Sequence, residues 1–410
     1  MHPLREALHN ELHARPSIHL AGPAHVHHYA MLEQEGQAEE LLARIDALVD
    51  RERDPEVVQE ILEIDGMALK WERHTEFFTL TLMVPREPEG KLWPETPPLL
   101  EALITPYREQ VVSATLLLVE AAHRWAGSPE AYGFQGPAGS QVADGEATVW
   151  SDFRLTPEGV NRLLLVNQAL DGFRLGRMAR RLLEIETYRM MASLALPLAR
   201  EMRTELDAYE RELDELSVRN AEEQEESSRP LLAAISELSS RLEHASARSR
   251  LRFSATEAYG RIVDARIEEL REVKVGESPR LGVFIQRRFQ PLVRFCAAIH
   301  RRQEELAESV ARLNDLLRTR AQVEIEEQNA EMLRSLNERT SSQLKIQKAV
   351  EGLSIIVISY YLFSLFKLGL QSLDALGVPI VPQIAAAIIA PLGLGILAVL
   401  AWRIWRVKQH

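Results

Sequence analysis

Two long apolar segments close the chain. Residues 352–366 carry no charge before Lys367, and residues 375–402 carry none at all. An uncharged stretch of about 18 or more residues is long enough to cross a bilayer as a helix. The second segment exceeds that length, and the first reaches it when Lys367 snorkels toward the membrane surface. The pattern predicts a two-helix transmembrane hairpin over residues 351–402; the alternative is a hairpin buried in a soluble core.

Charges beside these segments indicate how the hairpin is oriented. The turn at residues 371–380 contains no Lys or Arg. Residues 1–9 hold no apolar signal region that would export the chain. The positive-inside rule therefore predicts that the N- and C-termini are cytoplasmic, with a basic cytoplasmic tail at residues 403–410. The basic flanking residues are Arg339, Lys345 and Lys348 before the hairpin, and Arg403, Arg406 and Lys408 after it.

Residues 171–350 have the pattern of a helical stalk. Apolar residues recur there in steps of four and three, the spacing of a coiled-coil seam. Helix breaks are expected at residues 222–230 and 276–279, which separate three long helices, the third running into the membrane segment. The three seams are Met202, Leu206, Tyr209, Leu213 and Leu216; Leu231, Ile235, Leu238, Leu242 and Ala245; and Leu306, Val310, Leu313 and Leu317.

The third stalk helix is longer than its expected neighbours by residues 323–350. Apolar side chains in that stretch face water unless another chain or the N-terminal domain covers them. We therefore predict self-association or a protein partner through the stalk; the alternative is an antiparallel bundle within one chain. The side chains concerned are Met332, Leu333, Leu336 and Leu344.

Residues 1–170 alternate short apolar runs with turns. Residues 37–50 are amphipathic, with Leu41 and Ile45 on one face, and residues 97–104 form a second helix candidate. Mixed strands and helices of these lengths predict a compact cytoplasmic α+β domain. The strand candidates are residues 26–32, 67–73, 75–84, 111–120 and 148–155, with a shorter one at 163–166.

Charge and cysteine content narrow the class of protein. The chain has 410 residues and a net charge of −12, which argues against a nucleic-acid partner because phosphate binding requires a basic surface. Its one cysteine, Cys296, excludes an intrachain disulfide and fits a reducing compartment. Since Cys296 lies between Phe295 and Ala297, we expect it to pack in a core rather than to act as a nucleophile.

Seven of the twelve histidines lie within the first 28 residues. His9 and His13 are four positions apart, which is metal-ligand spacing on a helix, and Arg15 follows them. The metalloprotease pattern requires Glu directly after the first His, and the chain has Asn there. We take His9, His13 and Arg15 as candidate binding residues, with helix capping and surface packing as the alternative and no metal expected.

A second candidate site lies at residues 71–77, which read WERHTEF. Alternation along a strand projects Glu72, His74 and Glu76 from one face. Two carboxylates beside an imidazole are suited to acid–base work or to holding a cation. Trp71, Arg73 and Phe77 are expected near the other face.

Salt bridges offer a simpler explanation of the same residues. Glu72 and Glu76 could be neutralised by Arg73 or Arg154, and the segment would then be a satisfied sheet face. Asp152 and Arg154 form a similar polar pair at a strand end. All six charged or imidazole groups named at these two places remain candidate binding residues.

Motifs of common enzyme classes are missing from the sequence. There is no Gly-Lys-Ser/Thr phosphate loop and no Gly-x-Ser-x-Gly nucleophile turn. We therefore expect neither an enzyme nor a cofactor. The sequence favours a membrane-anchored cytoplasmic protein with a binding or scaffolding role.

Five phrases of the sequence resemble a family of bacterial membrane-anchored proteins that is catalogued as a domain of unknown function. The resemblance extends over nearly the whole chain. It implies a protein of the bacterial inner membrane and assigns no activity. The phrases are residues 2–16, 71–77, 151–154, 182–191 and 350–361.

A looser similarity, in the order of the parts, relates the chain to CorA-type magnesium channels. Those channels depend on a Gly-Met-Asn motif in the outer turn, which residues 368–379 lack. On a helix, Ser354 and Ser359 are 140° apart and Ser359 and Ser364 are another 140° apart, so the three serines form no single polar stripe. We therefore expect no divalent-cation conductance, and a CorA-like channel or transporter is the alternative function.

Overall fold

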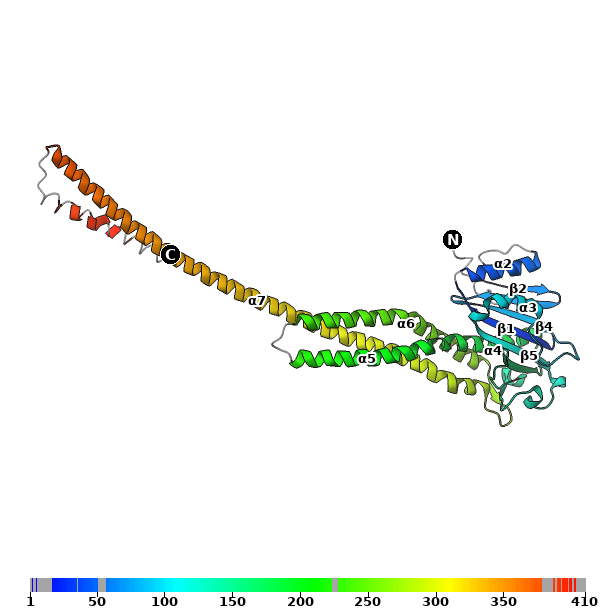
Figure 1. Ribbon diagram of the computed structural model, residues 1–410. Coiled ribbons are helices and arrows are strands. Elements are labelled where there is room, and N and C mark those ends of the chain that lie inside the picture. The colour runs from blue at the N-terminus through cyan, green and yellow to red at the C-terminus, as the bar shows by residue number, and fades with distance from the viewer. Residues whose placement is uncertain are drawn as a thin grey trace. The chain divides into compact units, whose positions relative to one another are not determined.

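The computed structural model contains two compact units, which span Met1–Leu317 and Arg318–His410. Figure 1 shows the elements of both units. The residues that the structure describes are 2, 5, 17–34, 36–50, 57–222, 228–377, 386–387, 389–391, 393–396, 398–399 and 402.

The first unit is built on a nine-stranded sheet within the described part of the chain. Its strand order is β2-β3-β4-β1-β5-β8-β7-β6-β9. The β5–β8 pair is parallel, and the other neighbours are antiparallel. The strands are β1 (Ala24–Leu32), β2 (Gln59–Ile64), β3 (Met67–Arg73), β4 (Phe77–Pro85), β5 (Val111–Ala121), β6 (Ala138–Val142), β7 (Ala147–Ser151), β8 (Asn161–Asn167) and β9 (Val273–Lys274).

Helices cover both faces of this sheet. Helices α2 (Gln37–Val49) and α3 (Pro98–Ile104) pack on one face, and α4 (Gly172–Ser193) packs on the other. Because both faces of the central strands are buried, these strands read as nearly continuous apolar runs rather than as alternating ones. Short 3₁₀ helices occupy Thr105–Gln110, Ala122–Arg124, Pro129–Tyr132 and Ala143–Gly145.

Strand β1 shows how one strand serves two cores. Val26 and Ala30 point into the core under α4, while Tyr29 and Met31 point into the core under α2 and α3. Period-two alternation assigns these pairs to opposite faces, so a register shift of one residue would exchange them. The register of β1 is therefore held from both sides.

Three long helices continue the first unit beyond the sheet (Figure 1). They are α5 (Ala195–Glu222), α6 (Arg229–Glu269) and the first part of α7 (Leu281–Ala375). The apolar residues with four-three spacing meet in one buried cluster, which confirms that these three helices pack together. Cys296 is buried in that cluster, and burial raises the pKa of its thiol to about 11, as expected for a packing residue.

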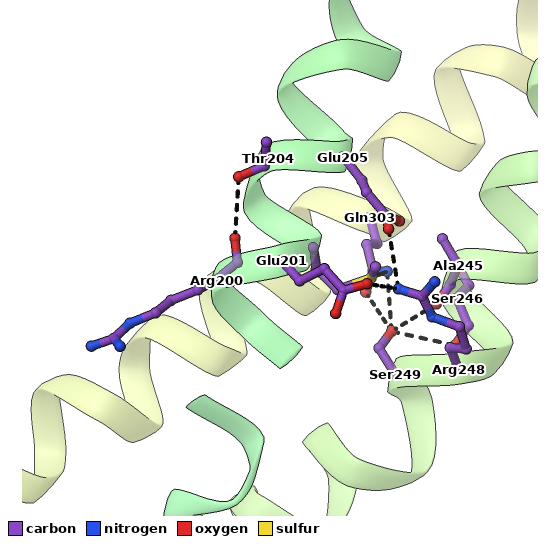
Figure 2. Close-up of polar contacts among 10 residues, drawn as sticks. Arg200, Glu201, Thr204, Glu205, Ala245, Ser246, Arg248, Ser249 and Gln303 are labelled. Carbon is purple, nitrogen blue, oxygen red and sulfur yellow. Dashed lines mark hydrogen bonds and ion pairs between the residues drawn. The ribbon is translucent and has the colours of Figure 1, made fainter. Parts of the chain in front are cut away.

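A polar layer crosses this bundle. The Gln303 side-chain amide of α7 donates to Ser249 Oγ of α6 at 3.1 Å and lies 3.5 Å from the sulfur of Met202 on α5. Figure 2 shows this contact beside Arg248, which pairs with two carboxylates of α5. A buried amide that finds its partner in only one alignment favours that register of the helices.

The second unit begins at Arg318 and includes the rest of α7. Helix α7 contains the single stretch, among the described residues, that is long and apolar enough to cross a membrane, and none of that stretch is buried. Residues 393–396 are also helical, and a Cβ placed on Gly393 would lie 2.0 Å from the ring of Phe363. Gly393 therefore permits a close approach to the α7 surface within this unit.

The predicted α+β class of the N-terminal region is confirmed, and a long C-terminal helix follows this region in the chain. The expected strands at 26–32, 67–73, 75–84, 111–120 and 163–166 are present with end shifts, and the one at 148–155 is shortened to β7. Three strands escaped the sequence analysis. The edge strand β2 is rich in Gln and Glu, β6 consists largely of small residues, and β9 has only two residues.

The sequence predicts a domain boundary near residue 170, and the first compact unit of the structure extends past it to Leu317. Helices α4 and α6 and the start of α7 share a buried cluster with the sheet. The sheet and the helices up to Leu317 therefore belong to one compact unit.

Two glycines of α4 allow residues 17–20 to lie directly against that helix. The Leu20 amide donates to the Gly172 carbonyl at 3.1 Å. A Cβ on Gly176 would lie 1.9 Å from the Ile18 carbonyl oxygen, which is far inside van der Waals contact. The spacing of Gly172 and Gly176, one helical turn apart, opens a track for the N-terminal segment.

We expect Gly176→Ala to lower the free energy of unfolding by about 1–3 kcal/mol, because the added methyl must displace the Ile18 backbone. Gly22→Ala is the matched control, since a Cβ there meets nothing within 4 Å. Denaturant unfolding of both variants measures the difference. Equal stability of the two would contradict the close packing.

Candidate functional site

A pocket lies between the sheet and α4 in the first unit. It has a free volume of about 50 Å³, enough for a few waters or a small ligand fragment. Strands β1, β3 and β4 form its floor, and α4 and residues 17–20 form its walls. Its apolar lining residues include Leu20, Val26, Phe77 and Leu183.

Polar side chains cross the otherwise apolar sheet face next to this pocket. The strand register aligns Lys70 of β3, Thr81 of β4, His28 of β1, Thr115 of β5 and Asn161 of β8. Directly paired residues point to the same face of a sheet. We call these five residues the polar row. Each of them is buried.

His28 is the centre of the polar row and touches α4. Its Nδ1 lies 2.8 Å from Thr81 Oγ1, and its Nε2 lies 2.9 Å from Thr187 Oγ1. Burial lowers the pKa of His28 to about 4, so the ring is neutral at pH 7. A neutral imidazole has one donor and one acceptor nitrogen, so one of the two threonine hydroxyls accepts and the other donates.

Lys70 and Glu72 form an ion pair at the pocket floor. Lys70 Nζ lies 2.9 Å from Glu72 Oε1. Burial lowers the pKa of Lys70, and Glu72 partly offsets that effect. Burial, the largest single influence, would raise the pKa of Glu72, but the charge and hydrogen bond of Lys70, together with His74 and His28, outweigh it and hold that pKa below its usual value. The carboxylate is therefore ionised at neutral pH.

His74 lines the mouth of the pocket. Its ring stacks on Phe77 with centroids 4.2 Å apart, and Tyr188 of α4 meets it edge-on at 6.3 Å. The sequence pattern predicted that Phe77 and His74 point to opposite faces of the strand, and this prediction is wrong. Strand β3 ends at Arg73, and the turn before β4 restarts the alternation, so Phe77 faces α4 together with His74.

Several buried polar atoms near the pocket have no hydrogen-bond partner among the described residues. They are Thr79 Oγ1 in the pocket wall, and Thr115 Oγ1 and both amide atoms of Asn161 in the polar row. An unsatisfied buried polar group costs about 1–3 kcal/mol. Ordered water or a ligand in this region would remove that cost.

Two other candidate residues of the 71–77 segment, Glu76 and Arg73, form contacts that hold neighbouring elements of the fold together. The Glu76 carboxylate accepts from Tyr259 Oη at 2.5 Å and pairs with Arg252, which ties the β3–β4 turn to α6. Arg73 points away and pairs with Glu33 at 2.7 Å and with Glu39 on α2. The structure therefore brings Glu72 and His74 together in the pocket and separates both from Arg73.

Asp152 and Arg154 lie at the end of β7, away from this pocket. Asp152 accepts from the backbone N–H groups of Gln135 and Arg154 at 3.1 and 3.2 Å. The Arg154 guanidinium donates to the Gln135 side chain at 2.7 Å. Asp152 also borders a second hollow lined by Arg189 and Arg288. Their contacts organise a loop, and a binding role for this pair stays a prediction.

His9, His13 and Arg15 lie outside the described residues. Within the residues that the structure does describe, no group of three or more His, Cys, Asp or Glu side chains is arranged to hold a metal ion.

The sequence analysis missed Lys70, His28 and Thr187 as pocket residues. A lysine inside the apolar run of β3 was a local signal, because Lys is seldom fully buried without a partner. The role of His28 depends on strand register and on helix α4, 159 positions away at Thr187. No local pattern carries that information.

These features define an α+β protein that has a buried polar pocket and, farther along the chain, one helix apolar enough to cross a membrane. The chain belongs to the family described as "Protein of unknown function (DUF3422)", whose model matches residues 1–410. This confirms the family resemblance found in the sequence phrases. No curated protein and no solved structure matches the chain.

The buried His28 makes stability depend on pH. Its folded-state pKa of about 4 lies below the ordinary 6.5, so the unfolded chain binds more protons between these values and stability falls as pH falls. We expect the wild type to lose about 2 kcal/mol more than His28→Gln between pH 7 and pH 5. Glutamine retains hydrogen-bonding groups but does not titrate.

Denaturant unfolding of the full chain in detergent at both pH values measures this effect. Lys70, Glu72 and His74, the charged or titratable groups that act on His28, are present in both proteins. The control, His123→Gln at an exposed position, should keep the wild-type pH dependence. An unchanged slope in His28→Gln would refute a neutral buried His28.

Proposed function

We propose that this protein is a membrane-anchored cytoplasmic binding or scaffolding protein. One observation carries the proposal: no residue in the apolar stretch of α7 in the second unit is buried. Side chains there, including Leu353, Ile356, Ile358, Leu362 and Leu365, are each more than half exposed. Burying one such side chain away from water stabilises the protein by about 1.5–3 kcal/mol, and the lipid of a bilayer provides apolar surroundings for it.

A hairpin is the arrangement of the anchor that we favour. Residues 375–402 are uncharged and long enough for a second crossing, and the Gly393–Phe363 approach supports helix contact of the small-residue kind. The basic flanks favour cytoplasmic N- and C-termini in a bacterial inner membrane. In this topology the first unit, with its pocket, is in the cytoplasm.

One serine of the first crossing supports an anchor rather than a channel. Ser354 Oγ donates to the Val350 carbonyl at 2.9 Å, and just after the crossing Ser372 Oγ donates to the Leu368 carbonyl at 3.0 Å. Hydroxyls bonded to their own helix offer fewer groups to an ion. We therefore assign this segment to membrane attachment.

We expect the double variant Ile358→Arg/Leu362→Arg to leave the membrane fraction. An arginine at the centre of a spanning helix costs about 2.5–3.5 kcal/mol. The control, Met332→Arg/Leu336→Arg, has the same spacing on exposed positions outside the apolar stretch and should stay with the membrane. Fractionation after a carbonate wash measures both. Retention of the first variant would refute the anchor.

Reporter fusions at residues 1 and 410 test the orientation in the same experiment. Both should report the cytoplasm. A periplasmic signal from either end would exclude the hairpin with two cytoplasmic termini while leaving membrane attachment itself in place.

Self-association through the second unit is part of the proposal. A seam with four-three spacing runs along the exposed surface of α7, and polar residues interrupt it at Asn329, Arg339 and Gln343. Seams of this kind pack against an equal seam in coiled coils. The second copy of the chain supplies such a seam in register. The apolar members are Ile325, Met332, Leu336, Ile346, Val350, Leu353 and Val357.

We expect Leu336→Cys to give disulfide-linked dimers in membranes, because Leu336 lies on this seam. Glu338→Cys, about 200° around the helix, should give few. The native Cys296 is buried and its thiol pKa is raised, so it contributes little background. Non-reducing electrophoresis after mild oxidation is the measurement. Monomers alone, or equal crosslinking at both positions, would argue against the dimer.

A further inference from the structure

We propose that the pocket between the sheet and α4 binds a small organic monocarboxylate, with its carboxylate on Lys70 and Thr79 and a short apolar tail among the aliphatic walls. This inference extends the binding role proposed above to a ligand class. It does not depend on the membrane anchor, because the pocket lies wholly within the first unit.

Unused donors on the pocket floor call for an acceptor. The Lys70 ammonium has three N–H donors, and its one ion-pair partner among the described residues is Glu72. Thr79 Oγ1 is buried in the same wall without a hydrogen-bond partner in the described chain. Thr79 lies directly opposite Glu72 across the β3–β4 pair, so the Thr79 hydroxyl and the Lys70 ammonium border the same part of the pocket. An anionic oxygen there would satisfy them together.

The charge of the linked ionic network favours an anion. Glu184 pairs with Arg180 at 3.2 Å and with Arg266. Arg180 and Glu184 act electrostatically on Lys70, which joins this network to the pocket floor. Among the described residues, the ion pairs named here join four cations and three carboxylates, so this group carries an excess of positive charge that an anion would reduce. The members are Lys70, Arg180, Arg181 and Arg266, and Glu72, Glu184 and Glu269.

The rest of the pocket selects the remainder of the ligand. The lining also contains Arg180 and Glu184, which pair with each other at 3.2 Å, whereas Ile18, Leu20, Val26, Ala179 and Leu183 form an uncharged wall for the rest of the ligand. A free volume of about 50 Å³ admits only a few heavy atoms. A short aliphatic acid matches both limits, whereas a sugar or nucleotide exceeds them.

Residues 17–20 complete the enclosure. Ser17, Ile18 and Leu20 line the pocket, and the segment is held against α4 at Gly176. Removing the tail from water behind this segment strengthens the ion pair between the carboxylate and Lys70, since charges interact more strongly in a low dielectric.

Calorimetric titration of the full-length protein in detergent tests the proposal. The probes are butyrate, its neutral isostere butyramide, and inorganic phosphate. We expect saturable binding of butyrate and at least about ten-fold weaker binding of the other two. Equal affinity for butyramide would show that charge is not recognised, and tighter binding of phosphate would replace the carboxylate by a phosphate ligand. Failure of all three probes at millimolar concentration would overturn the proposal.

Two variants locate the binding. Lys70→Met/Glu72→Gln removes the ion pair as a unit, so no unpaired buried charge remains, and it should weaken butyrate binding at least about ten-fold. Thr79→Val keeps the shape and removes a hydroxyl without a partner, so it should fold as well as the wild type and weaken binding about three-fold or more. Unchanged affinity in both variants would move the ligand elsewhere.

Lys274→Met, at an exposed position on β9, is the control and should bind butyrate like the wild type. Membrane fractionation of the same variants separates this inference from the proposed function. Loss of butyrate binding with normal membrane attachment is the expected result. A protein that never binds butyrate but stays in the membrane would refute the ligand and leave the anchor intact.

Discussion

Helix α4 packs on a sheet face that buries polar as well as apolar side chains. The stability of the first unit depends on how these buried polar groups find partners. The polar row would oppose burial if its members lacked partners. At its centre, Thr187 of α4 and Thr81 of β4 supply His28 with both hydrogen bonds that a neutral ring can make. At one end, Lys70 and Glu72 neutralise each other. The helix therefore completes the hydrogen bonds of His28, at the centre of the polar row, as well as covering the apolar core.

The same constraint explains why a pocket exists here. Apolar side chains fill space between helix and sheet by interdigitating, but charged groups must keep their partners at hydrogen-bonding distance. The ion-pair partner of Lys70 is Glu72 of its own strand, and the two glycines of α4 bring the Ile18 backbone and the His19 ring close to that helix. The free space lies where these polar groups and the glycine track meet.

Sequence patterns predicted much of the fold and part of the site. The α+β class and most strands followed from apolar runs, and the bundle followed from four-three spacing, since these are local properties of the chain. Glu72 and His74, both candidates from the sequence, line the pocket, and they were singled out because they lie in one short segment with a marked polar pattern. His28, Thr187 and Thr79 were not, because their meeting depends on strand register and on a helix far along the chain. The side on which Phe77 points was mispredicted, since a turn after Arg73 interrupts the alternation.

Strand β9 has a consequence for the order in which the chain folds. Ser140 of β6 donates a hydrogen bond to Glu272 beside β9, 132 positions later, and the intervening chain includes α4, α5 and α6. Contacts this distant in sequence slow folding, because a large loop must close first. On the ribosome the sheet stays incomplete until the α5–α6 hairpin has been synthesised. Until then, the edge of the sheet and its core under α4 are exposed to other chains. At a synthesis rate of about 5–20 residues per second, this lasts several seconds or more. A chaperone would be most useful in that interval.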